Sequence, residues 1–86
     1  MRPPMHELGI ANSVLEAVQA ETARRPGAVA VKVGVRVGRL AGVDPDALAF
    51  GFEALTAGTE WRDLKLAIED ASGDELDLMY VELEEP

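Results

Sequence analysis

The sequence contains no cysteine among its 86 residues. We therefore expect no disulfide, no thiolate nucleophile and no cysteine-ligated zinc. No apolar run approaches the roughly 20 residues that a membrane-spanning helix needs. The opening residues carry one positive charge, Arg2, with no apolar region behind it, so they do not match a signal peptide. The length of 86 residues predicts a single domain over residues 1–86. The absences predict that it is located in the cytoplasm rather than in a membrane.

Basic residues are also scarce in this chain. Lys and Arg together number 8, against 16 Asp and Glu, which leaves a formal net charge of −8. A surface of that sign repels phosphate backbones, so nucleic acid is not an expected partner. A basic protein surface or a cation would suit it. The apolar content of 48% is sufficient for a folded core.

Groups that catalyse reactions are few and scattered. The only histidine is His6, which has no hydroxyl-bearing neighbour in the sequence. No Gly-x-Gly-x-x-Gly motif and no Walker lysine is present, so the sequence predicts no phosphate-binding loop. An enzyme needs a nucleophile with a base, or an acid and a base, in one pocket. We therefore predict a protein that binds something rather than an enzyme.

Apolar residues at three- and four-residue spacing predict a helix over residues 7–25. Residues 1–4, which include two prolines, are predicted to form a loose leader. Asp44 followed by Pro45 is a typical helix start with aspartate as the N-cap, and the second helix is predicted to run to about residue 57. Phe50 lies off the apolar stripe of that helix and is expected to cover the first helix.

Alternating valines predict a strand over residues 28–39. Its predicted buried face consists of Val29, Val31, Val33, Val35 and Val37. Shorter alternating runs at 64–68 and 76–83 predict two more strands, the last with two apolar sets that could face either way. Turn-forming residues 71–74 predict that these two strands pair as an antiparallel hairpin. The order α-β-α-β-β predicts an α+β fold, with two helices on one face of a small three-stranded mixed sheet.

Three side chains are candidate metal ligands. His6 and Glu7 lie at the start of the first predicted helix, and Asp44 caps the second. A neutral imidazole and two carboxylates are reasonable ligands for a divalent ion of borderline hardness. The three would meet if the two helix starts lie side by side. The alternative is that His6 is solvated and Asp44 is only a helix cap.

Three segments of the chain carry a family resemblance. The segment MHELGIANSVL at residues 5–15 closely resembles the opening of the HypA/HybF family of nickel chaperones, which act in nickel–iron hydrogenase maturation. The segments VGVRVGRLAGV at 33–43 and PDALAFGFEALTAGT at 45–59 are similar to the same family in order and spacing. The resemblance covers most of the chain, and the nickel domain of the family has the same α-β-α-β-β order.

The resemblance implies a function in nickel delivery. In the family, the histidine of the Met-His-Glu opening supplies an imidazole to a largely planar nickel site, which nearby backbone nitrogens and the terminal amine complete. A neighbouring glutamate and an aspartate before the second helix assist. By position these residues are His6, Glu7 and Asp44. The implied partners are a maturation GTPase and the hydrogenase large subunit.

Two departures from the family pattern qualify this expectation. The family carries a cysteine-rich zinc ribbon between its last two strands, whereas here the turn at 71–74 takes its place, so structural zinc is expected to be absent. Four residues precede Met5 and would displace the terminal amine from His6, so the planar site depends on whether the native start is Met1 or Met5.

Other readings of the sequence remain open. A metal-independent protein-interaction domain on the same scaffold is the main alternative to a nickel carrier. A weaker alternative is an enzyme subunit whose pocket is completed by a partner. The oligomeric state is also open, because an edge strand of a small sheet can pair with a second copy.

Overall fold

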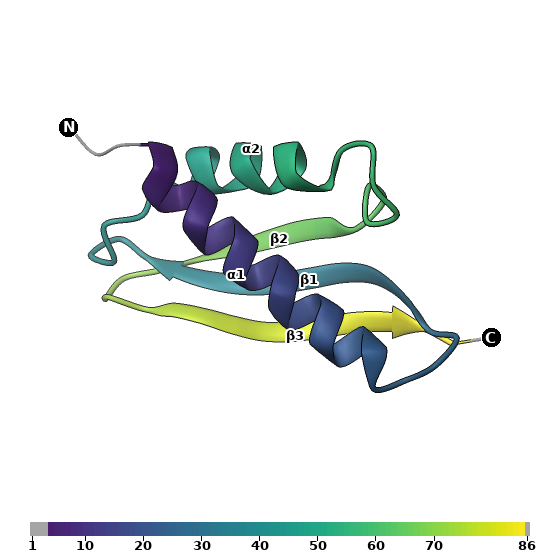
Figure 1. The fold of residues 1–86 in the computed structure, drawn as a ribbon. Coiled ribbons are helices and arrows are strands. Elements are labelled where there is room, and N and C mark those ends of the chain that lie inside the picture. The colour runs from purple at the N-terminus through teal and green to yellow at the C-terminus, as the bar shows by residue number, and fades with distance from the viewer. Residues whose placement is uncertain (1–3, 86) are drawn as a thin grey trace.

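The computed structural model describes residues 4–85, with side chains from His6 onward, and it confirms the predicted α+β fold. Two helices lie on a mixed three-stranded sheet, in the order α-β-α-β-β (Figure 1). The elements are α1 (Pro4–Ala23), β1 (Val29–Gly38), α2 (Pro45–Thr56), β2 (Lys65–Ala71) and β3 (Leu76–Glu84). No helix in the described residues has both the length and the apolar character needed to cross a membrane.

Helix α1 is offset from its predicted range at both ends. It begins at Pro4, which the sequence places in the leader; residues 1–3 lie outside the described residues. Proline suits a first helical position, because the N–H that it lacks would have no partner there. The helix ends at Ala23. Arg24 then donates its N–H to the carbonyl of Glu21, 3.2 Å away and three residues earlier, so the last turn is wound more tightly than an α-helix.

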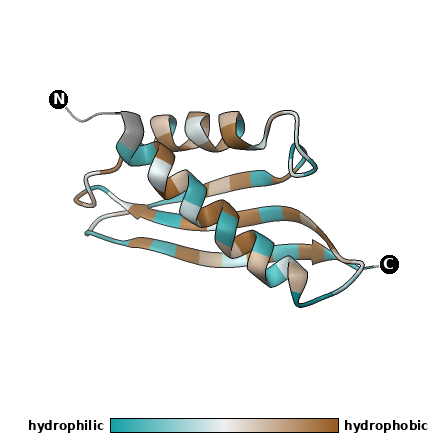
Figure 2. Ribbon diagram, viewed as in Figure 1, coloured by the Kyte–Doolittle hydropathy of each residue, from teal (hydrophilic) through white to brown (hydrophobic). Residues whose placement is uncertain are grey.

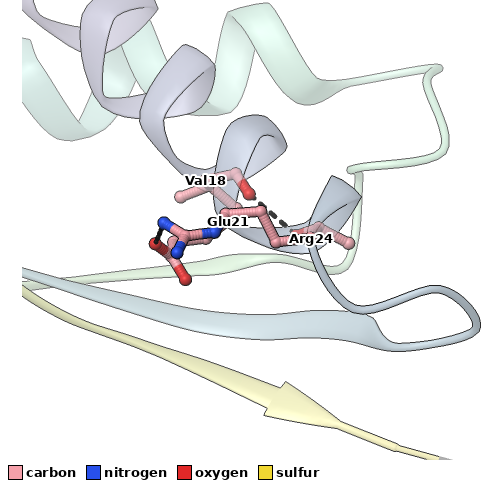
Figure 3. A network of polar contacts seen from close by, with 4 residues as sticks. Val18, Glu21 and Arg24 are labelled. Carbon is pink, nitrogen blue, oxygen red and sulfur yellow. Dashed lines mark hydrogen bonds and ion pairs between the residues drawn. The ribbon is translucent and has the colours of Figure 1, made fainter.

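Side-chain contacts support this end of α1 (Figure 3). The hydroxyl of Thr22 donates to the carbonyl of Val18 at 2.8 Å. The guanidinium of Arg24 lies 3.3 Å from the carboxylate of Glu21. Both groups of this ion pair are largely exposed, so it contributes little to stability.

The predicted hairpin of β2 and β3 is wrong, because β1 lies between these two strands. Strand β1 pairs in parallel with β2, as the β-α-β order predicts, and antiparallel with β3. Residues 72–75 therefore cross the end of β1. Gly38 donates its N–H to the carbonyl of Glu75 at 2.7 Å, and Leu40 donates to that of Gly73 at 2.8 Å. The turn-forming residues thus bind the end of β1 instead of closing a hairpin.

The core lies between the sheet and the two helices, which cover the same sheet face (Figure 1). Helix α1 contacts β1 and β3, α2 contacts β2, and the helices pack against each other. Val33, Val35 and Val37 are buried as predicted, but Val29 is 60% exposed and Ala30 is buried instead. The reason is a β-bulge at residue 31, between the pairs of residues 30 and 32 with β3, which reverses the alternation before it.

A second bulge decides which way β3 faces. Val35 pairs with Leu78 while Gly34 pairs with Tyr80, so Met79 is the extra residue. Each apolar set of β3 therefore faces the helices along part of the strand. These helix-facing residues are Leu76, Leu78, Val81 and Leu83, opposite inward-facing residues of β1. Apolar residues recur along all three strands (Figure 2).

Helix α2 follows its prediction in extent but not in the role of Phe50. It starts after the N-cap Asp44 and buries Leu48 and Phe52, but Phe50 is 74% exposed and does not cover α1. The position against α1 is taken by Gly51. A Cβ built on Gly51 would lie 3.5 Å from the Cα of Leu8, an ordinary van der Waals contact, so the two helices pack against each other at this position.

Gly34 gives a test of the β1–β3 packing. A Cβ placed on Gly34 would overlap the ring of Tyr80, its partner on β3. Replacing Gly34 by alanine is therefore expected to lower the free energy of unfolding by about 1–2 kcal/mol. Urea denaturation measures the change. In a Tyr80→Ala background the same substitution is expected to cost almost nothing, and an equal cost in both backgrounds would contradict the proposed overlap.

Candidate functional site

His6 and Glu7 are neighbours in the first turn of α1 but face in different directions. His6 is exposed, whereas Glu7 is only 2% exposed. Glu7 precedes Ala11 and Val18 by four and eleven residues, and both of these are fully buried. That spacing places Glu7 on the buried stripe of the helix. The same spacing is visible in the sequence and could have identified Glu7 as an inward-facing carboxylate.

The buried carboxylate of Glu7 joins the two helix starts. Its Oε2 accepts a hydrogen bond from the backbone N–H of Asp44 at 3.1 Å. The carboxylate of Asp44 in turn accepts from the N–H groups of Asp46, at 3.0 Å, and Ala47, at 3.4 Å. Carboxylates at helix N-termini are stabilised by the positive end of the helix dipole. The first turn of α1 is therefore held against the first turn of α2.

The structure brings together two of the three predicted ligand residues. Glu7 and Asp44 meet through a backbone N–H, and each carboxylate already accepts a backbone hydrogen bond. His6 lies on the exposed side of α1. Within residues 4–85, no group of three or more His, Asp or Glu side chains is placed to hold a metal ion. A metal ion bound at His6 would therefore need donors other than three clustered side chains.

A groove lies beside His6, between α1 and β3, with a volume of about 430 Å³. Its α1 wall includes Ile10 and Val14, and its β3 wall includes Leu76 and Leu78. The lining is mainly apolar. The sequence could not reveal this groove, because it forms only where α1 crosses a strand that is some sixty residues away along the chain.

The capping role of Asp44 gives a second test. Replacing Asp44 by alanine removes the acceptor for two N–H groups at the start of α2, so the free energy of unfolding is expected to fall by about 1 kcal/mol. Urea denaturation measures this loss. Asp46→Ala is the matched control, because Asp46 is an exposed acid of the same turn, and its loss is expected to cost less than about 0.5 kcal/mol. Equal losses would contradict a specific cap.

The chain is similar to known proteins over most of its length. Residues 5–78 match the sequence profile of a family described as "Hydrogenase/urease nickel incorporation, metallochaperone, hypA". The chain is 42% identical over 66 residues to the hydrogenase maturation factor HypA of Roseiflexus sp. (strain RS-1), a stretch covering 77% of this chain and 54% of the relative. It is 45% identical over 71 residues to the same-named protein of Rhizobium leguminosarum bv. viciae, covering 81% and 62%.

A third relative, from Dechloromonas aromatica (strain RCB), is also called hydrogenase maturation factor HypA. It is 48% identical over 56 residues, which cover 64% of this chain and 49% of the relative. The chain thus spans about half to three fifths of the length of these relatives. The matched family segment begins at Met5, next to His6, and includes both Glu7 and Asp44.

Proposed function

This chain belongs to the HypA family, and from that premise we propose that it is a nickel-binding accessory protein that delivers nickel during hydrogenase maturation. The observation that supports the proposal is the position of His6. This exposed imidazole stands at the start of α1, where the buried contact between Glu7 and Asp44 holds the helix end in place.

We assign His6 as the side-chain ligand of nickel, and Glu7 and Asp44 as the residues that position it. Imidazole suits nickel, and deprotonated backbone nitrogens favour a planar arrangement around the ion. A backbone-assisted site needs only one side-chain ligand, which agrees with a first turn in which His6 is exposed and Glu7 is buried. The contact of Glu7 with Asp44 would limit the motion of that turn while the ion binds and leaves.

Nickel in this proposal is cargo rather than a resident cofactor. A site on an exposed helix end can pass its ion directly to a second protein, which suits delivery. The absence of cysteine leaves zinc without its usual structural ligands in this chain.

The partners we propose are a maturation GTPase and the hydrogenase large subunit that receives the ion. The net charge of −8 favours association with a partner that presents a basic surface. In this proposal the protein is a carrier and not an enzyme.

The second candidate function is a metal-independent protein-interaction domain. The observation that favours it is that the carboxylates of Glu7 and Asp44 already accept backbone hydrogen bonds. These bonds give both residues a structural role without a metal. A direct measurement of nickel binding distinguishes the two functions, because only the carrier requires it.

Calorimetric titration of nickel into two forms of the chain tests the proposal. One form starts at Met1 and the other at Met5, where the family match begins. We expect calorimetry to show that the Met5 form binds one nickel ion. The visible absorption spectrum of the same sample is expected to be that of a planar nickel complex. Binding by that form alone would show that the terminal amine is required. If neither form binds nickel, the delivery proposal is wrong and the interaction domain is favoured.

A further inference from the structure

Strand β3 has a free edge that differs from the other edge of the sheet. Among residues 4–85 it pairs only with β1, so within this part of the chain the backbone N–H and C=O groups of its outer edge have no strand partner. Such an edge can accept an added strand from another protein. Each edge strand is contacted by one helix, β2 by α2 and β3 by α1. On β2, the inward-facing Leu66 and Ile68 are partly buried. On β3, by contrast, Leu76 and Leu78 are 44% and 43% exposed.

The helix-facing side of the β3 edge is apolar. Leu76 and Leu78 pair with the buried valines Val37 and Val35, so their side chains face the helices. They line the groove of about 430 Å³ whose other wall is α1. A strand added outside β3 would direct every second side chain toward this groove. Those positions of the added strand therefore require apolar residues.

The opposite side of the β3 edge carries three acidic residues together with Tyr80, which pairs with Gly34. Asp77, Glu82 and Glu84 are exposed, and none of them forms an ion pair within the described residues. Their register partners on β1 are, in the same order, Arg36, Lys32 and Val29. Arg36 pairs instead with Glu69, at 3.1 Å. The remaining side chains of an added strand would lie beside these carboxylates, so they are expected to be lysine or arginine.

We propose that the free edge of β3 binds an extended segment of a partner protein in which basic and apolar residues alternate. The acidic side of the edge and the apolar groove together specify that alternation. A second copy of this chain fits poorly, because residues 74–85 contain six acidic residues and no basic one, so two such edges would repel each other. The surface uses none of the proposed nickel-positioning residues and goes beyond nickel delivery.

A short peptide of alternating valine and lysine is the probe. We expect it to bind the isotope-labelled 86-residue chain, with changes in the NMR amide shifts of β3 and of the groove residues on α1. A peptide of alternating valine and glutamate, and a valine–lysine peptide interrupted by proline, are expected not to bind. Affinity is expected to fall as salt is raised, because the carboxylates are exposed.

Charge reversal at the edge gives the decisive variant. Asp77→Lys, Glu82→Lys and Glu84→Lys together are expected to weaken binding of the lysine peptide about tenfold. The matched control, Glu16→Lys, Glu53→Lys and Glu60→Lys, makes the same change in net charge at exposed sites off β3 and is expected to weaken it far less.

Several outcomes would overturn the proposal. These are no binding of the lysine peptide, equal losses in the two triple variants, or shift changes confined to residues away from β3. A stable dimer of the chain alone that the β3 charge reversal disrupts would assign the edge to a second copy instead. Loss of nickel binding would leave the proposal intact, because the peptide assay contains no metal.

Discussion

Replacing Glu7 by alanine is expected to lower the free energy of unfolding by about 2–4 kcal/mol. Glu7 is 2% exposed, and its carboxylate accepts the N–H of Asp44 at 3.1 Å. Alanine would leave that N–H without its acceptor and would open a cavity between the two helix starts. Urea denaturation followed by circular dichroism measures the loss.

Two further variants separate the hydrogen bond from general effects of the substitution. Glu7→Gln keeps the size and an acceptor oxygen, so it is expected to retain most of the stability. Glu16→Ala removes an exposed glutamate from the same helix and is expected to change the free energy by less than about 0.5 kcal/mol. A loss for Glu7→Ala no larger than that of Glu16→Ala would show that the buried contact does not hold the helices together.

Replacing His6 by alanine is expected to weaken nickel binding at least about 100-fold while leaving the fold intact. The chain contains one histidine, so no other imidazole can replace it. Loss of a direct ligand is expected to exceed the roughly 10–100-fold losses seen when a residue that only orients a ligand is removed. His6 is exposed, so the free energy of unfolding is expected to change by less than about 0.5 kcal/mol. Calorimetry and denaturation measure the two effects separately.

Asp77→Asn is the matched control for His6→Ala. Asp77 is an exposed acid on β3 and is not among the proposed nickel residues. Nickel binding is expected to be unchanged in this variant. Equal weakening by both substitutions would indicate nonspecific binding to surface carboxylates. If the His6→Ala variant bound nickel with unchanged affinity, the imidazole of His6 would not be a nickel ligand.

The sequence was sufficient to name the residues of the candidate site but not their contacts. The pair His6-Glu7 at a helix start and the Asp-Pro start of α2 are local patterns, and the structure confirms Asp44 as the N-cap. The hydrogen bond from Asp44 to Glu7 joins residues 37 positions apart. It forms where α1 and α2 pack against each other, and no local spacing encodes that contact.

Local periodicity also explains which parts of the fold could be predicted. Helix and strand patterns depend on neighbouring side chains, so the five elements and their order followed from spacing alone. Parallel pairing of β1 with β2 followed from the intervening helix, because parallel neighbours need such a crossover. These features need no information about distant parts of the chain.

Strand order and side-chain facing depended on packing between distant segments. Residues 71–74 have the composition of a hairpin turn. In the structure, however, the carbonyls of Gly73 and Glu75 accept N–H groups at the end of β1, and β3 pairs with the side of β1 opposite β2. The bulges at residues 31 and 79 reverse the alternation of β1 and β3. They place apolar side chains under the two helices at the cost of a regular pairing between the two strands. A bulge is a compromise between two strands, so a single strand's pattern cannot reveal it.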